Sequence, residues 1–203
     1  MNMSVPSARR GPGRPAGGQP VIGRAELLDA AARAITSIGP NATLDDIAAT
    51  AQVAKPTVYR VLGDRSAIVS ALADVLILRA EQVILPLRDG PASEWSPRER
   101  FHATISRFLT AMSEDRNVFL FVNAGHDATL LTKVLGQAAR GLVEMFTCVA
   151  PRPQADRGRA YGMIGAVQAS VTAWLIDPWC ELDDLAASLT ELLWDGLASA
   201  AAA

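Results

Sequence analysis

The segment from Thr43 to Arg65, TLDDIAATAQVAKPTVYRVLGDR, limits the fold of this chain more than any other stretch of its 203 residues. Thr43 is a good helix N-cap, and Asp46 stands three residues later, where its carboxylate can bond back to the cap amide. Pro56 fits only the first turn of a helix, where its missing N–H costs nothing. The segment therefore predicts two short helices joined by a tight turn at residues 51–54.

The second of these helices, expected at Lys55–Val61, has an outer face suited to DNA. A helix N-terminus attracts phosphate through its free amides. Basic side chains add charge there, and hydroxyl groups are neutral donors that position a protein on phosphates. A threonine methyl can also contact a thymine methyl in the major groove. The alternative is a capped helix pair that only contributes to an all-α core. The predicted DNA-binding residues of the segment are Thr43, Lys55, Pro56, Thr57, Tyr59, Arg60 and Arg65.

These residues carry a family resemblance. The stretch LDDIAATAQVAKPTVYRVLGDRSAIVSAL resembles the signature of the TetR family of bacterial repressors, and the detailed similarity extends from about Ala25 to Leu76. It implies an all-α protein, with a three-helix helix-turn-helix DNA-binding head and a helical ligand-binding and dimerisation body, about nine helices in total. The chain departs from the signature at three places. Gln52 replaces the usual turn glycine, Ala54 replaces the usual serine cap, and Val61–Leu62 replace the usual histidine–phenylalanine pair.

Composition agrees with a helical DNA-binding protein. Half of the residues are apolar, and the scarcity of aromatic residues beside many alanines favours helices over strands. Residues 1–65 hold eight basic and five acidic side chains, whereas residues 66–203 hold eleven and sixteen. A basic head on an acidic body suits a sequence-specific binder whose body stays away from the DNA. Because the sequence shows neither a membrane-spanning apolar run nor a secretion signal, we expect a cytoplasmic protein.

Three regions are expected along the chain. Residues 1–22 form an arm rich in Gly, Pro and Arg that should be disordered on its own. Within the arm, Gly13-Arg14-Pro15 resembles the core of an AT-hook, which would place Arg14 in a narrow minor groove; the alternative is a solvated tail. Residues 23–70 are the expected DNA-binding domain, which begins with an amphipathic helix at Arg24–Ile38. Residues 71–203 are the expected effector-binding and dimerisation domain.

The last two helices of the body have wide apolar faces. Small residues form a stripe on the first, at about 156–176, and leucines line the second, at about 183–200. The resemblance implies a homodimer through these two helices, although an internal core would give the same periodicity. The other helices expected after the recognition helix are 64–85, ended by Pro86, then 97–113, 115–122 and 127–149.

The resemblance also implies a pocket for a small-molecule effector within the body. Aromatic residues and methionines cluster between Trp95 and Trp174. We therefore expect a mainly apolar effector fixed by one or two polar groups. Ordinary core packing would place the same residue types there. The expected lining is Phe108, Met112, Phe119, Asn123, His126, Met145 and Trp174.

Catalytic, metal and cofactor sites are not expected. His126 and Asp127 are adjacent, so they do not face each other on a helix, and no nucleophile motif lies nearby. His102 is expected on the surface. The two cysteines, Cys148 and Cys180, and the two histidines lack metal-ligand spacing, and no glycine-rich phosphate loop is present.

The sequence thus predicts a transcriptional regulator that is not an enzyme. Its expected partners are a duplex DNA operator, a small-molecule effector and a second copy of the chain. The simplest form is a repressor that a mainly apolar ligand releases from a palindromic operator. The alternatives are an activator, a ligand-independent regulator, or a helical ligand carrier or enzyme with a vestigial head.

Overall fold

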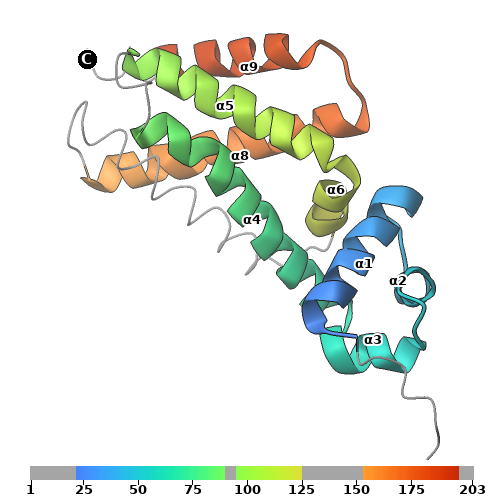
Figure 1. Cartoon of the computed structure of the whole chain (residues 1–203). Helices are drawn as coiled ribbons and strands as arrows, with labels where there is room; N and C mark the ends of the chain where they lie inside the picture. Colours follow the sequence, from blue (N-terminus) through green and yellow to red (C-terminus); the bar gives the residue numbers. More distant parts are fainter. Residues whose placement is uncertain (1–21, 90–94, 125–152, 197–203) are drawn as a thin grey trace, which may run out of the picture.

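The computed structural model describes residues 22–89, 95–124 and 153–196, with side chains except at 83–89 and 153–157. All regular elements in these residues are helical, as the sequence predicts. Three short helices form a head at one end, and longer helices form a body at the other (Figure 1). The predicted helix at 127–149 lies outside the described residues. The elements are α1 (Arg24–Ile38), α2 (Leu44–Thr50), α3 (Lys55–Leu62), α4 (Arg65–Asp89), α5 (Pro97–Glu114), α6 (Arg116–Ala124), α8 (Pro153–Ile176), α9 (Leu182–Thr190) and a π-helical turn at Glu191–Asp195.

The head is held together by one apolar stripe from each of its helices. α1 has the predicted bounds and buries Leu27 and Ile35 completely. Burying a side chain of this size contributes about 1.5–3 kcal/mol relative to leaving it exposed. The other large side chains buried in the head are Ile47 of α2, Val58 and Leu62 of α3, and Ile68 and Leu72 of α4.

Two glycines end the head helices at positions that need left-handed backbone. Gly39 follows α1 with φ of 110°, and its N–H donates to the carbonyl of Ile35 at 2.8 Å. Gly63 follows α3 with φ of 95°, and a Cβ there would stand 2.8 Å from the Cβ of Ala67. Because only glycine tolerates both constraints, the chain can turn sharply from α3 into α4.

The turn between α2 and α3 contains a residue in an unfavourable conformation. Gln52 has φ of 55°, a left-handed value that no other non-glycine residue adopts in the described ranges. Gln52 stands where the resembled signature has a glycine, and its positive φ shows why a glycine suits this position. A non-glycine residue in this region costs about 1–2 kcal/mol. The tight turn is retained because Val53 N–H donates to the Ala48 carbonyl at 3.0 Å.

α4 passes from the head into the body without a break, and here the sequence-based prediction was wrong. Pro86 was expected to end the helix near residue 85, yet the helix continues to Asp89. A proline removes one backbone donor and crowds the carbonyl four residues earlier. The helix nevertheless continues for one turn from Pro86 to Asp89. The predicted domain boundary at residue 70 falls inside α4, so it coincides with no interruption of the backbone.

The body is built around α5, which contacts α4, α8 and α9. Ser96 caps α5 through a capping box, with Glu99 N–H donating to Ser96 Oγ at 3.3 Å. The π-helical turn after α9 faces the first half of α5, where the Phe101 and Trp194 rings lie 5.5 Å apart. Figure 1 shows α9 lying along α5, on the far side of the body from the head.

His102 is half-buried between α5 and α9, which corrects the prediction of a surface residue. Its Nδ1 lies 3.0 Å from Oγ1 of the buried Thr190. The Thr190 hydroxyl donates its only hydrogen to the Ala186 carbonyl at 2.7 Å. His102 Nδ1 therefore donates to Thr190, and it stabilises the last turn of α9 just before the π-helical turn.

The strain at Gln52 predicts that Gln52→Gly stabilises the head. Relief of the left-handed conformation is partly offset by the greater freedom of glycine in the unfolded chain, so the free energy of unfolding should rise by about 0.5–1 kcal/mol. Urea unfolding measures this change. The control is Ala49→Gly on the exposed face of α2, which should lower the same quantity by about 1 kcal/mol. A destabilising Gln52→Gly would contradict the assignment of strain.

Candidate nucleic-acid interface

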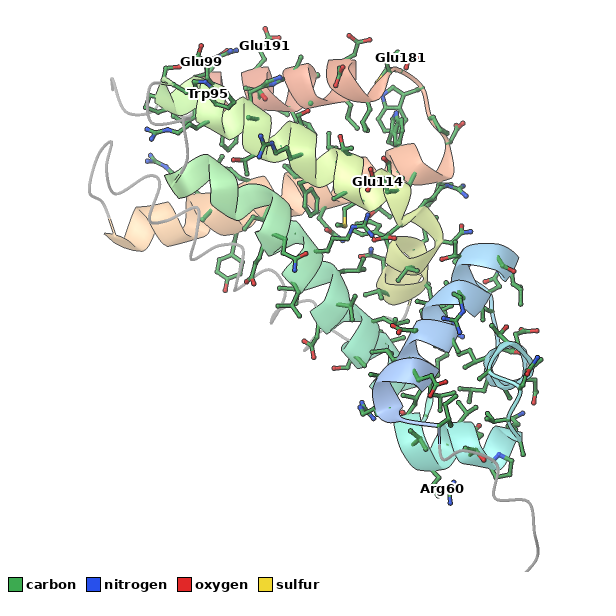
Figure 2. All side chains as sticks on the ribbon, viewed as in Figure 1. Arg60, Trp95, Glu99, Glu114, Glu181 and Glu191 are labelled. Atoms are coloured by element: carbon green, nitrogen blue, oxygen red, sulfur yellow. The ribbon has the colours of Figure 1, made fainter. Side chains whose placement is uncertain are left out.

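α3 presents a polar face at the end of the molecule that lies farthest from the body. Val58 and Leu62 are buried on its inner side, while Lys55, Tyr59 and Arg60 are exposed. Figure 2 shows Arg60 at the lower edge of the head, pointing away from α1 and α4. Thr57 is partly buried and Pro56 is exposed in the first turn. The residues of the predicted outer face thus lie on the exposed side of α3, with Thr57 partly buried.

Lys55, the first residue of α3, already has a partner on α2. Its Nζ donates to Oδ2 of Asp45 at 2.8 Å, across the turn of the helix pair. Hydrogen bonding to Asp45 raises the pKa of Lys55 above its ordinary value. Both side chains remain accessible, with exposed fractions of 45% and 67%. The ammonium therefore stays charged and within reach of a phosphate.

Thr43 forms the predicted capping box of α2, which the structure confirms. Its backbone N–H donates to Asp46 Oδ2 at 2.7 Å, and its Oγ1 accepts from the Asp46 N–H at 3.3 Å. The Thr43 hydroxyl also donates to Asp46 Oδ2 at 2.6 Å. These bonds, the side-chain one first, hold the pKa of Asp46 below its ordinary value. A phosphate contact by Thr43 would have to share its hydroxyl with Asp46.

Arg65 points to the body rather than extending the face of α3. Its Nη1 donates to the Ala42 carbonyl at 2.9 Å and its Nη2 to the Pro40 carbonyl at 3.5 Å. The guanidinium carbon lies 4.2 Å from the ring centroid of Phe121 on α6, within range of a cation–π interaction. Arg65 thus joins the α1–α2 loop to the body.

α6 is the body helix that is hydrogen-bonded to α1 of the head. Asn117 Nδ2 donates to the carbonyl of Thr36 in α1 at 2.9 Å. Beside it, Arg116 Nε donates to the Leu175 carbonyl near the end of α8 at 2.7 Å. Arg79 of α4 stabilises the turn between α5 and α6 through ion pairs of 2.6 Å to both Glu114 and Asp115. The start of α6 is therefore fixed between α1, α4 and α8.

The other end of α6 carries a polar pair. Asn123 Nδ2 donates to the Phe119 carbonyl at 2.8 Å, and its Oδ1 accepts from Gln168 Nε2 of α8 at 2.6 Å. Both amides are partly buried. Gln168 was not among the residues predicted to line the effector site. No local sequence pattern identifies Gln168, because its contact with Asn123 arises from the packing of α8 against α6.

The remaining residues predicted to line the effector site are more scattered. Met112 and Phe119 lie in the hydrophobic core, Phe108 is partly buried against it, and the Trp174 indole donates to the Cys180 carbonyl at 2.9 Å. His126 and Met145, and Arg14 of the arm, lie outside the described residues. Within the described ranges, no three His, Cys, Asp or Glu side chains gather as a metal site would need, and no helix is long and apolar enough to cross a membrane.

In the head, a capped helix is followed by a tight turn and then by a helix with an exposed face. This order of elements is that of a helix-turn-helix DNA-binding protein. Residues 27–72 match the family model described as bacterial regulatory proteins, tetR family. The head of the chain is therefore a helix-turn-helix domain of the TetR type, and the chain is similar to DNA-binding transcriptional regulators. Members of this family are regulators and not enzymes.

Relatives extend the similarity along most of the chain. An uncharacterized HTH-type transcriptional regulator of Mycobacterium tuberculosis is 25% identical over 183 residues, which cover 86% of this chain and 76% of the relative. A TetR-like regulator from Rhodococcus sp. RHA1 has a TM-score of 0.64 at 22% identity and covers 86% of this chain and 96% of its own. The fatty acid regulator FadR from Bacillus subtilis, solved in complex with stearoyl-CoA, has a TM-score of 0.61 at 20% identity and covers 82% and 95%. These structures share the fold.

Proposed function

We propose that the chain is a homodimeric repressor that binds a palindromic operator and leaves it when a small, mainly apolar ligand enters the body. The observation that carries this proposal is the double role of α6. Asn117, at its start, is bonded to α1 of the head, and Asn123, at its end, is bonded to α8 of the body. A ligand that displaces the end of α6 would therefore move the attachment of the head. Only a ligand that fits the two arrangements differently can shift DNA affinity.

On DNA, the proposed major-groove element is α3. Lys55 and Arg60 would neutralise phosphates, Tyr59 and Thr57 would donate hydrogen bonds, and Pro56 would pack against the backbone. Arg14 of the arm would enter the adjacent minor groove. The division into an arm at residues 1–22, a head at 23–70 and a body at 71–203 is kept as part of this proposal, with α4 continuous across the last boundary.

The proposed effector site lies between α5, α6 and α8. Apolar side chains of these helices would hold an apolar chain, and the Asn123–Gln168 pair would bind one polar group of the ligand. A structural neighbour was solved with stearoyl-CoA, and another is described as a fatty acid degradation regulator. This supports a long-chain acyl compound as the first class to test. The proposed lining keeps Phe108, Met112, Phe119, Asn123, His126, Met145 and Trp174, with Gln168 added.

The proposed dimer interface uses the last two helices, 156–176 and 183–200 in the sequence-based prediction. Three large apolar side chains at α8, the α8–α9 corner and the π-helical turn are well exposed in the single chain. Their exposed fractions are 64% for Ile176, 58% for Trp179 and 67% for Leu192. Exposed large apolar side chains on these elements are candidates for a protein interface, and a two-fold axis would bury both copies of each.

Replacing Lys55 by alanine should weaken binding to every duplex by a similar factor. The slope of log K against log salt should become less steep by about one unit, because one phosphate contact is lost. Fluorescence anisotropy on a random-sequence duplex at several salt concentrations measures both quantities. Arg98→Ala on α5 removes the same charge from the opposite end of the molecule and should leave the slope unchanged. An unchanged slope in Lys55→Ala would remove Lys55 from the interface.

Stearoyl-CoA should bind the body and release DNA, whereas coenzyme A without an acyl chain should do neither. At a concentration of about 100 Kd, a ligand specific for the folded state adds about 2.7 kcal/mol of stability, which thermal melting detects readily. The competition is followed on a duplex that the protein binds. Asn123→Ala should weaken the response to stearoyl-CoA without changing affinity for DNA in its absence. Equal effects of both compounds would argue against a mainly apolar effector.

The protein should have the mass of a dimer in solution, and Leu192→Asp should convert it to a monomer. A carboxylate in an apolar interface would have to be buried without a partner, which costs several kcal/mol. Light scattering coupled to size exclusion measures the mass. Ile38→Asp, at an apolar position on the head that is 54% exposed, is the matched control and should leave the dimer intact. A dimeric Leu192→Asp protein would place the interface elsewhere.

A further inference from the structure

Asp45 occupies an unusual place for an acidic side chain on a DNA-binding surface. It stands in the first turn of α2, where the neighbouring Asp46 forms the capping box with Thr43. No capping bond involves the Asp45 carboxylate; it accepts a hydrogen bond from Lys55 Nζ at 2.8 Å. The exposed fraction of its side chain is 67%, so the carboxylate lies at the surface beside the recognition helix. Stabilising the α2 dipole accounts for a charge at this position but not for the bond to Lys55.

This placement conflicts with phosphate binding. Lys55 can contact a phosphate only by sharing its ammonium with Asp45 or by leaving it. If the ammonium is shared, the carboxylate and the phosphate are close enough to repel each other, inside the screening distance of about 8 Å at physiological salt. If Lys55 leaves, its ion pair with Asp45 is lost. Asp45 therefore opposes the contact that Lys55 would make.

We propose that Asp45 is an affinity-determining residue of the DNA-binding surface, which competes with phosphate for Lys55 and so weakens binding to all duplexes. The inference rests on the proposed phosphate contact of Lys55. Since a phosphate contact carries no sequence information, Asp45 lowers specific and non-specific affinity by the same factor. It thereby sets how readily the regulator leaves DNA without changing which sequence it prefers.

The salt dependence of binding gives this competition a distinct signature. When a free lysine binds phosphate, the DNA releases condensed cations, which contributes about 0.9 unit per contact to the slope of log K against log salt. When the lysine must first leave Asp45, salt also screens and weakens the ion pair that has to be broken, so part of the salt dependence is cancelled. Removing the charge of Asp45 should therefore make the slope steeper, although the number of protein–phosphate contacts is unchanged.

The test compares Asp45→Asn with the full-length parent chain on a labelled random-sequence duplex, between about 50 and 200 mM salt. Asp45→Asn should bind about two- to fivefold more tightly at the upper salt concentration, in keeping with the strength of an exposed ion pair. Its slope should be steeper by up to about 0.9 unit. Asp45→Glu retains the charge and should behave like the parent. Asp184→Asn, in the first turn of α9, is the matched control for net charge and should change neither quantity.

The double variant Asp45→Asn/Lys55→Ala separates competition from general charge repulsion. Without Lys55, loss of the Asp45 charge should no longer steepen the slope. A slope that steepens as much in this background as in the parent would overturn the competition with phosphate. Weaker binding by a folded Asp45→Asn protein, checked by thermal melting, would instead make Asp45 a residue that positions Lys55, and would also overturn the proposal.

The same set of variants distinguishes failure of this inference from failure of the proposed contact. If Lys55→Ala alone leaves the slope unchanged, Lys55 does not bind phosphate and the premise is wrong. If Lys55→Ala lowers the slope while Asp45→Asn behaves like Asp184→Asn, the contact stands and the role of Asp45 is refuted.

Discussion

The continuous helix α4 is the element on which the rest of the structure depends. Its first half completes the core of the head with Ile68 and Leu72, and it continues into the body, where it contacts α5 and α6. The apolar side chains of head and body form a single connected cluster. Because packed cores change between discrete arrangements and do not deform continuously, a displacement in the body is transmitted to the head with little loss.

The contacts around α6 add a second connection between the two parts. The joint is polar: Asn117 bonds to α1, Arg65 bonds to the α1–α2 loop and covers Phe121, and the ion pairs of Arg79 fix the corner before α6. Exposed polar contacts of this kind contribute little to stability, typically less than about 1 kcal/mol each, so they can exchange at small cost. An apolar helix beside an exchangeable polar joint suits the proposed dimeric regulator, which would hold its two heads at one of two spacings.

Sequence reasoning succeeded where the signal was local and failed where it depended on packing. The capping box at Thr43, the tight turn at residues 51–54 and the start of a helix at Pro97 follow from residue types at short spacing, and each is present. Partners distant in sequence were not predictable: Arg65 faces Phe121, Asn123 faces Gln168, and His102 faces Thr190. The continuation of α4 beyond Pro86 was also missed, because a proline can disturb a helix without ending it. The DNA-contact and effector-lining roles of individual residues stay predictions until binding is measured.

Selection of bound sequences from random duplex DNA, with the purified protein at physiological salt, tests the central claim most directly. Two copies of α3 held at a fixed spacing predict an enriched palindrome whose half-sites are separated by about one helical turn, roughly 10 base pairs, or a multiple of it. A folded protein that enriches no motif, or only a single unpaired half-site, would contradict the account of a dimeric regulator that reads its operator with paired recognition helices.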